Sequence, residues 1–258
     1  EAASPDIRSY PTFNEFFNFE PKFGFRLYDV GGNEIPYQRV TQRREVAGYR
    51  LRPQKFPHFD PRHEVDVTVA LKIPAYGYTS IICRPATGEP TRYLGTMAVD
   101  DHTIENEHLR VSAGCNGTLT VTDKRSGQSY ENLLTLEDCA DIGDGWYHGV
   151  AINEQMFSSI ASSAEVGLVQ DGINKATLMV RVTMNLPEAF LFDRMQRSTA
   201  YKPMIVTHEV TLRRGADHVE VRTVVDNNIR DHRLRVLLPT QAKAKTYLAD
   251  QAFDVIER

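Results

Sequence analysis

Four carboxylates fall within eight residues of this chain, at the start of the segment 137–149, which reads EDCADIGDGWYHG. They belong to Glu137, Asp138, Asp141 and Asp144. No basic residue lies between them, so their mutual repulsion must be relieved by solvent, by backbone amides, by a cation or by a sugar. The adjacent aromatic residues Trp146 and Tyr147 follow. We take this segment as the first candidate for a binding function.

Three interpretations of the segment 137–149 stay open on sequence alone. In the first it is a solvated turn whose aspartates accept hydrogen bonds from nearby backbone amides. In the second it contacts a sugar, because carboxylates accept hydrogen bonds from hydroxyl groups and an aromatic ring stacks on a pyranose face. In the third its oxygen atoms bind calcium. A loop of this kind, mounted on a rigid sheet, is where binding or chemistry is usually placed.

A second group of potential ligands is the run His58-Phe59-Asp60-Pro61, with His63 close behind. Imidazole and carboxylate are metal ligands, but the segment 52–62 holds three prolines, which we expect to break any regular element. We therefore expect a solvated loop there rather than a metal site. No Gly-x-Ser-x-Gly motif occurs, and His208, between valines of an expected strand, suits a buried structural role. We predict no catalytic residue and no metal ligand in this chain.

The elements that position the acidic segment are expected to be strands. Apolar residues alternate with polar ones at 109–111 and again at 119–121, which is the pattern of strands with one buried face. Between them, Asn116-Gly117 suits the positive φ angles of a two-residue hairpin turn. Ser126-Gly127 marks a second turn before a strand expected over 128–136. The acidic segment would then be the long loop that begins at Glu137.

The same alternation recurs along the chain and predicts an all-β protein built from antiparallel sheets. A hairpin is expected from the runs 23–30 and 35–40, and the run 65–73 is expected to form a half-buried strand. These elements would make a small antiparallel β-sandwich over residues 1–95. A proline-containing linker at 84–92 then leads into a second, larger β domain over residues 96–258.

Composition excludes several classes of function. Hydrophobic residues make up 41% and charged residues 25% of the 258 residues, as in ordinary globular proteins. The formal charge of −4 provides no basic surface for nucleic acid, and no apolar stretch is long enough to span a bilayer. We therefore expect neither nucleic acid nor membrane as a partner. The three cysteines are widely spaced and form no Cys-x-x-Cys pair, which favours free thiols in a cytoplasmic protein.

Four motifs carry a resemblance to a known family. They are Ile104-Glu105-Asn106-Glu107, Asn116-Gly117-Thr118-Leu119, Asp141-Ile142-Gly143-Asp144 and Asp231-His232-Arg233-Leu234-Arg235-Val236. This pattern resembles the α-mannosidases of glycoside hydrolase family 38. The resemblance implies that residues 96–258 are the first part of the family's large C-terminal domain, a β-supersandwich of the galactose-mutarotase type. It also implies that residues 1–95 are the small β-sandwich that precedes it.

The resemblance implies a function for the chain as part of a larger enzyme. Family members hydrolyse α-mannosidic bonds with retention in an N-terminal domain, whose zinc ion is held by two histidines and two aspartates. The motif His58-Phe59-Asp60-Pro61 is only superficially similar to that zinc segment, because it lies in the wrong domain. We therefore expect a non-catalytic chain that binds no zinc itself. Its partners would be the missing N-terminal catalytic domain and α-mannoside oligosaccharides.

The resemblance also implies site residues. In bacterial relatives the loop matching 143–147 reads Gly-Asp-x-Tyr and approaches the substrate, whereas here Trp146 follows Gly145 and Tyr147 comes one place later. On that basis we predict Asp144, Trp146 and Tyr147 as substrate-binding residues.

Two alternatives remain to the scaffold of an α-mannosidase. One is a stand-alone carbohydrate-binding module. The other is an epimerase or lyase on the same fold, for which the sequence offers no evident base. A truncated supersandwich would leave strand edges unpaired, so we also expect a homo-oligomer.

Overall fold

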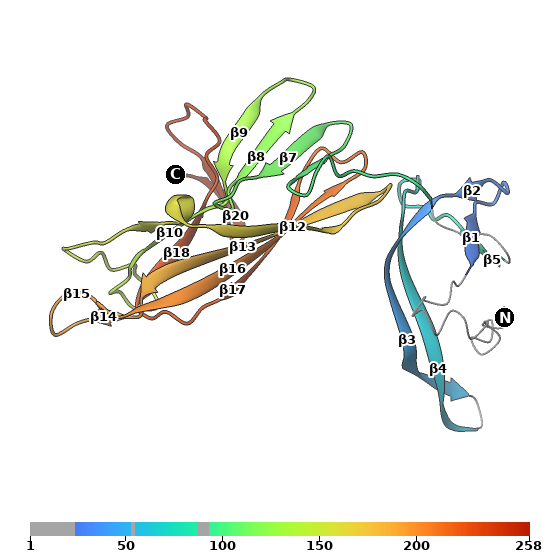
Figure 1. Ribbon diagram of the computed structural model, residues 1–258, viewed down its shortest axis with the longest axis horizontal. Coiled ribbons are helices and arrows are strands. Elements are labelled where there is room, and N and C mark those ends of the chain that lie inside the picture. Colours follow the sequence, from blue (N-terminus) through green and yellow to red (C-terminus); the bar gives the residue numbers. More distant parts are fainter. Residues whose placement is uncertain (1–23, 53–54, 87–92) are drawn as a thin grey trace.

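The computed structural model describes residues 24–52, 55–86 and 93–258. Within these ranges, only the backbone is described for residues 44–45, 49–52 and 55–63. Its strands pair in antiparallel fashion throughout the described part, so the predicted all-β class is confirmed. No helix among the described residues is long and apolar enough to cross a membrane. Figure 1 shows a smaller N-terminal part beside a larger part that contains the remaining sheets.

The smaller part begins with a three-stranded sheet in the order β2-β1-β5. Its strands are β1 (Phe25–Tyr28), β2 (Glu34–Ile35) and β5 (Ile82–Pro85). The predicted hairpin is confirmed at its turn: Gly32 takes a φ of +83°, and the Asp29 carboxylate accepts a hydrogen bond from the Asn33 amide at 2.8 Å. Its second strand ends at Ile35, and the rest of the expected run 35–40 enters the next strand instead. The strands β3 (Tyr37–Arg52) and β4 (Lys55–Val69) form a long two-stranded ribbon that projects from this part (Figure 1).

The expected break at residues 52–62 was wrong, because β4 runs through most of this segment. Pro61 lies opposite Ala47 and His58 lies opposite Arg50 in the ribbon. A strand in a two-stranded ribbon is hydrogen-bonded along one edge only, so a proline nitrogen on the other edge breaks no ladder bond. At its far end β4 stops at Val69, earlier than expected. Leu71 and Ile73 lie beyond it and are 37% and 55% exposed.

The larger part is built on two four-stranded sheets. The first contains β6 (Thr103–Glu105), β7 (Leu109–Ala113), β8 (Leu119–Asp123) and β9 (Ser129–Leu133) in that order. The second has the order β12-β13-β16-β17, with β12 (Ala164–Gln170), β13 (Lys175–Pro187), β16 (Tyr201–Arg213) and β17 (Glu220–Asp226). Alternate residues of β13 and β16, such as Leu178 and Val210, pack in one core with Val111 and Leu119 of the first sheet. Each fully buried aliphatic side chain contributes about 1.5–3 kcal/mol.

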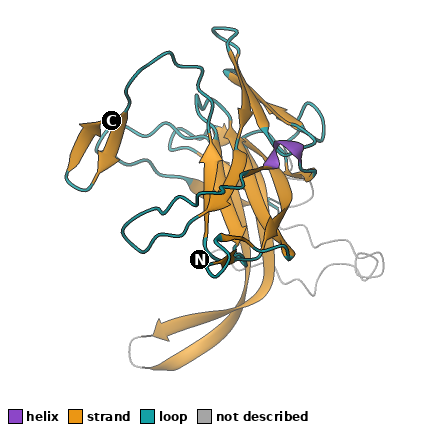
Figure 2. Ribbon diagram, turned by 90° about the vertical axis from the view of Figure 1, so that its left-hand side faces the viewer, coloured by secondary structure: helices purple, strands orange, loops and turns teal. Residues whose placement is uncertain are grey.

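Three smaller sheets complete the larger part. The strand β10 (Thr135–Ala140) lies between β11 (Phe157–Ser158) and β18 (His232–Leu237), and a 3₁₀ turn, η2 (Ser159–Ala161), follows β11. The short strands β14 (Phe190–Leu191) and β15 (Gln196–Arg197) pair with each other. The hairpin of β19 (Leu248–Gln251) and β20 (Asp254–Glu257) stands near the C-terminus (Figure 2).

The single strand expected over 128–136 is divided between two sheets. Asn132 and Leu134 have φ angles of +56° and +64°, so the chain turns sharply between β9 and β10. The second strand then continues to Ala140, four residues beyond the expected end. As a result, Glu137 and Asp138 lie in a strand and not in the acidic loop where we had placed them.

The turn at Asn116-Gly117 is longer than predicted. Ala113 and Leu119 are the last paired residues, so five residues connect β7 to β8. The Gly114 amide donates to the Thr118 carbonyl at 2.8 Å, and within this connection only Gly117 has a positive φ, of +82°. The hairpin itself is confirmed, whereas the two-residue length and the positive φ expected for Asn116 were wrong.

The two parts are joined by hydrogen bonds at the base of the β3–β4 ribbon. The Gln38 side-chain oxygen accepts from the amides of Asn174 and Lys175 at 3.0 and 2.9 Å, and its amide nitrogen donates to the Lys175 carbonyl. The Asn174 side chain donates to the Thr68 carbonyl at 2.9 Å. These bonds connect the ribbon to the turn between β12 and β13. The division near residue 95 stays a prediction.

We expect a buried histidine in β16 to make the stability of the fold depend on pH. His208 is fully buried, its Nδ1 lies 2.9 Å from the Thr223 hydroxyl, and its Nε2 has no partner. Burial lowers the pKa of His208 below its ordinary value of 6.5. The unfolded chain therefore binds this proton at a higher pH than the folded chain. Stability should be full above about pH 6.5 and should fall as the pH drops below that value.

We expect His208→Leu to remove this histidine's contribution to the pH dependence. The measurement is the midpoint of thermal unfolding between pH 7 and pH 5, followed by circular dichroism. The matched control is His102→Gln, because His102 lies in an exposed turn. An unchanged pH dependence in His208→Leu would contradict the prediction.

Candidate functional site

The loop that follows β10 is closed at its base by Asp141. One oxygen of its carboxylate accepts hydrogen bonds from the amides of Gly143 and Gly149, at 3.0 and 2.9 Å. The Ile142 amide donates to the Gly149 carbonyl at 3.0 Å, which draws the two ends of the loop together. A Cβ atom at Gly143 would lie 1.8 Å from the Tyr147 carbonyl oxygen, so only glycine allows this close approach.

The predicted site residues lie together at the tip of this loop. One Asp144 oxygen accepts hydrogen bonds from the amides of Trp146 and Tyr147 at 2.8 and 3.0 Å, and these bonds lower the pKa of the Asp144 carboxyl. The residues Trp146 and Tyr147 are 90% and 77% exposed. Asp144 therefore orders the loop backbone, as in the solvated-turn interpretation, and the loop presents two aromatic residues to solvent. A role of these three residues in substrate binding stays a prediction.

The four carboxylates avoid mutual repulsion because each has a different partner. Glu137 forms an ion pair with Arg235, which lies directly opposite it on β18. Asp138 contacts Arg197 and His232, and one oxygen of Asp141 lies 3.1 Å from His148 Nδ1. Asp144 is bonded to backbone amides. Among the described residues these four carboxylates do not gather into a group with metal-binding spacing, so the calcium interpretation gains no support.

Beneath the loop lies a buried polar cluster, which we define as Asp138, Arg197 and His232. Arg197 Nη1 and His232 Nδ1 each lie 2.5 Å from a different oxygen of Asp138. The three side chains are at most 5% exposed, and the Arg197 guanidinium also stacks over the Phe157 ring at 5.3 Å. Because the three residues come from β10, β15 and β18, the cluster fixes these strands relative to one another.

The buried cluster is continuous with the base of the loop. Asp231, next to His232, accepts a hydrogen bond from the Asp141 amide at its carbonyl oxygen and one from the Phe190 amide at its carboxylate. Ile142 packs against a small apolar group of Ala140, Ala151 and Phe190. In Figure 1 the loop after β10 and the β14–β15 hairpin accordingly extend from the same end of the larger part.

Sequence reasoning missed this cluster. The sequence pattern places Asp138 in the loop and gives His232 no role beyond the family motif, and Arg197 lies in none of the motifs. The partners of Asp138 lie 59 and 94 residues away along the chain, so no local spacing relates them. The available signal was the motif Asp231-His232-Arg233, which carries part of the family resemblance.

A second group of polar side chains surrounds Cys139. Its sulfur lies within 4.8 Å of a ring nitrogen of His148 and of a carboxylate oxygen of Glu154, and these two atoms also lie within 4.8 Å of each other. Burial raises the pKa of the Cys139 thiol, and a hydrogen bond to Glu154 raises it further. The other two cysteines, Cys83 and Cys115, are exposed, and all three are free thiols.

The other candidates offer less. The backbone of His58, Asp60 and His63 lies in β4, but their side chains fall outside the described residues, so the prediction of no metal there stays a prediction. The residues Asp100, Asp101 and His102 also lie within metal-ligand spacing, but they form an exposed turn in which Asp100 accepts a hydrogen bond from the His102 amide.

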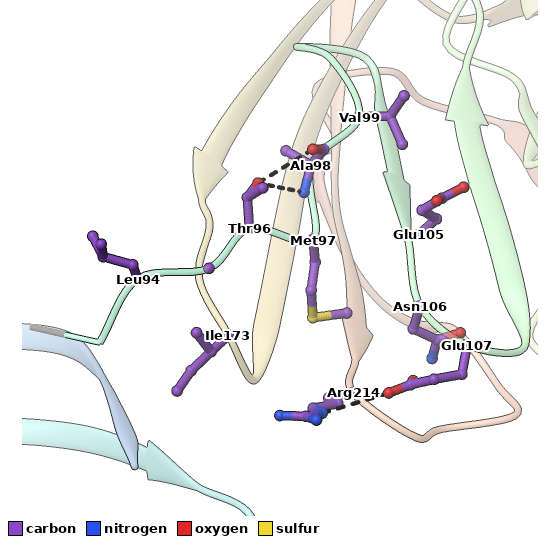
Figure 3. Close-up of a pocket in the computed structure, with 11 residues that line it drawn as sticks. Leu94, Thr96, Met97, Ala98, Val99, Glu105, Asn106, Glu107, Ile173 and Arg214 are labelled. Carbon is purple, nitrogen blue, oxygen red and sulfur yellow. Dashed lines mark hydrogen bonds and ion pairs between the residues drawn. The ribbon is translucent and has the colours of Figure 1, made fainter.

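A pocket of about 750 Å³ lies at the junction of the two parts (Figure 3). Its wall includes Met97, Ile173 and the acidic residues Glu105 and Glu107. Glu107 lies 3.5 Å from Arg214 and also accepts from the Gly215 amide, while Glu105 lies 3.6 Å from the Lys124 ammonium. The carboxylates of this pocket are thus held in structural contacts. None of the predicted site residues lines the pocket.

Comparison with known proteins identifies the family. Residues 104–258 match the model of the glycosyl hydrolases family 38 C-terminal domain. The chain therefore belongs to glycoside hydrolase family 38. This match confirms the resemblance on which the sequence interpretation was built.

Individual relatives agree with this assignment. The chain is 25% identical over 229 residues to a protein of Halalkalibacterium halodurans named "Putative mannosylglycerate hydrolase", covering 82% of this chain and 25% of that protein. The structure of an α-mannosidase from Enterococcus faecalis matches 98% of this chain with 26% identity and a TM-score of 0.77. A family 38 protein from the same species, at 23% identity and a TM-score of 0.78 over 95% of this chain, shows the same fold. The chain spans 25–30% of the length of these relatives.

Proposed function

We propose that this chain is the non-catalytic C-terminal β region of an enzyme that hydrolyses α-mannosidic bonds with retention. The main support is its similarity, over almost the whole chain, to 30% of an α-mannosidase structure. The wider enzyme would supply the catalytic domain and its zinc ion. The chain's own contribution would be a rigid β scaffold and one loop at the wall of the substrate pocket. We also propose that the protein is cytoplasmic and forms a homo-oligomer.

The loop 141–149 has the properties that such a wall requires. Asp141 closes its base and Asp144 orders its tip through backbone amides, so the loop is held in one shape. The aromatic rings of Trp146 and Tyr147 make no structural contribution to the core and remain available to stack on a pyranose ring. A loop that is rigid at its base and aromatic at its tip suits the recognition of a sugar.

The first test is Trp146→Ala in the full-length enzyme. Loss of one stacked ring, worth about 0.5–1.5 kcal/mol, should lower kcat/KM for an α-mannoside by a factor of about 2–12. The matched control is Tyr78→Ala, which removes an 88% exposed ring from the smaller part. Equal kinetic effects of the two substitutions would contradict a role for the loop at the pocket.

The isolated chain distinguishes the scaffold from a stand-alone carbohydrate-binding module. We expect no hydrolysis of an aryl α-mannoside by this chain, with or without zinc, and no heat on titration with mannobioses or mannosylglycerate. Millimolar or tighter sugar binding that Trp146→Ala abolishes would favour the binding module instead. Hydrolysis by the isolated chain would overturn the proposed division of labour.

A further inference from the structure

The group around Cys139 brings three metal-ligand types together from different segments. Cys139 lies on β10 before the loop, His148 lies near the end of the loop, and Glu154 lies in the stretch that leads to β11. A thiol sulfur, an imidazole nitrogen and a carboxylate oxygen thus converge with every pair within 4.8 Å. Thiolate, imidazole and carboxylate are the ligands that zinc uses in proteins.

The spacing of these atoms is close to what a bound zinc ion requires. With metal–ligand bonds of about 2.0–2.3 Å in a tetrahedron, the ligand atoms lie roughly 3.5 Å apart, so contractions of about 1 Å complete the site. Cys139 is fixed in a buried strand, whereas His148 and Glu154 are exposed residues whose side chains can make this movement by rotation, with the loop backbone unchanged.

A second contact supports the role of the histidine. One Asp141 oxygen lies 3.1 Å from His148 Nδ1. A carboxylate bonded to one ring nitrogen is the usual outer partner of a metal-binding histidine, because it fixes the ring and leaves the other nitrogen to the metal. Asp141 is itself held in place by the amides of Gly143 and Gly149. The imidazole is therefore oriented by a fixed group before any metal binds.

We propose that Cys139, His148 and Glu154 form a zinc site, with a water molecule as the fourth ligand. On binding, the Cys139 sulfur gives its proton to solvent and forms the bond to zinc. The thiolate favours zinc over calcium and magnesium, which prefer oxygen ligands. The sequence alone predicts no metal ligand in this chain, so the proposed site departs from that prediction, and the experiment below decides between them. It does not depend on sugar recognition by the loop, but it would tie β10 to the end of the loop that carries Trp146 and Tyr147.

The test uses cobalt as a spectroscopic probe on the 258-residue chain, freed of metal with a chelator. Cobalt bound by a thiolate gives a sulfur-to-metal charge-transfer absorption band. This band reports the metal–sulfur bond directly and does not depend on enzymatic activity. We expect this band at one cobalt per chain and its loss when zinc is added. Cys139→Ser should abolish the band, whereas Cys115→Ser, which changes an exposed cysteine elsewhere, should leave it intact.

Two further variants keep the test independent of folding. Glu154→Gln and His148→Gln change exposed residues, so both should fold, and each should weaken zinc binding at least about tenfold in a competition titration. Zinc should also raise the thermal unfolding midpoint of the wild-type chain but not of Cys139→Ser. Absence of the charge-transfer band in the wild-type chain, or its survival in Cys139→Ser, would overturn the zinc site and would leave the proposed function untouched.

Discussion

Replacing Arg197 by methionine should lower the free energy of unfolding by about 3–5 kcal/mol. The substitution removes a guanidinium that is 1% exposed and bonded to Asp138, which is itself fully buried. The aspartate would then keep only the His232 ring as a side-chain partner, in a place that water cannot reach. An uncompensated buried charge is far more costly than the loss of packing, since methionine fills much of the same volume. Chemical denaturation of the 258-residue chain measures the difference.

The matched control for Arg197→Met is Arg181→Met. Arg181 forms an ion pair with Glu165 at 3.3 Å, but the two side chains are 42% and 75% exposed. A surface pair of this kind contributes about 0–1 kcal/mol, so the control should cost little. Equal costs for the two arginines would contradict a structural role for the buried cluster.

A double substitution identifies the origin of the effect. Asp138→Leu combined with Arg197→Met removes both charges, and such replacements of buried pairs are often neutral or stabilising. The double variant should therefore be more stable than Arg197→Met alone. If it is less stable, the loss of packing and not the orphaned aspartate explains the result.

Gly117→Ala should cost about 2–5 kcal/mol, the second large effect that we expect. Gly117 has a φ of +82°, a conformation that costs other residues about 1–2 kcal/mol. A Cβ atom there would lie 2.5 Å from Val182 Cγ2 and 3.0 Å from Ala164 Cβ. Because these neighbours belong to β13 and β12 of the opposite sheet, the clash adds about 1–3 kcal/mol of overpacking.

Gly127→Ala is the control that separates these two contributions. Gly127 has a similar φ of +73° in the next hairpin, but nothing lies within 4 Å of its added Cβ. It should therefore show only the conformational cost of about 1–2 kcal/mol. Urea denaturation of both variants provides the comparison. If both glycines cost the same, Gly117 would be required for its backbone conformation alone, and the contact with the opposite sheet would be unimportant.

The sequence by itself determined the all-β class, several of the strands and several of their connections. Alternation of apolar and polar residues identified β7 and β8. The glycine of Asn116-Gly117 and the glycine of Ser126-Gly127 both take a positive φ. These features depend on residues that are neighbours in the chain, since side chains of a strand alternate between faces and glycine adopts the left-handed region at no steric cost. The family assignment was available for the same reason, because its motifs are short and continuous.

Tertiary structure alone decided how the acidic segment is used. The division of 128–140 between two sheets follows from the positive φ at Asn132 and Leu134. Asparagine tolerates this conformation, but no glycine or proline accompanies it, and leucine rarely adopts it. Because of this division, Asp138 lies in a strand in the protein interior and not in the solvated loop that the sequence predicts. Its partners Arg197 and His232, and the meeting of Cys139 with His148 and Glu154, depend on where strands and loops are placed in space. A charge is stabilised by whatever lies within a few ångströms, and sequence order does not specify those neighbours.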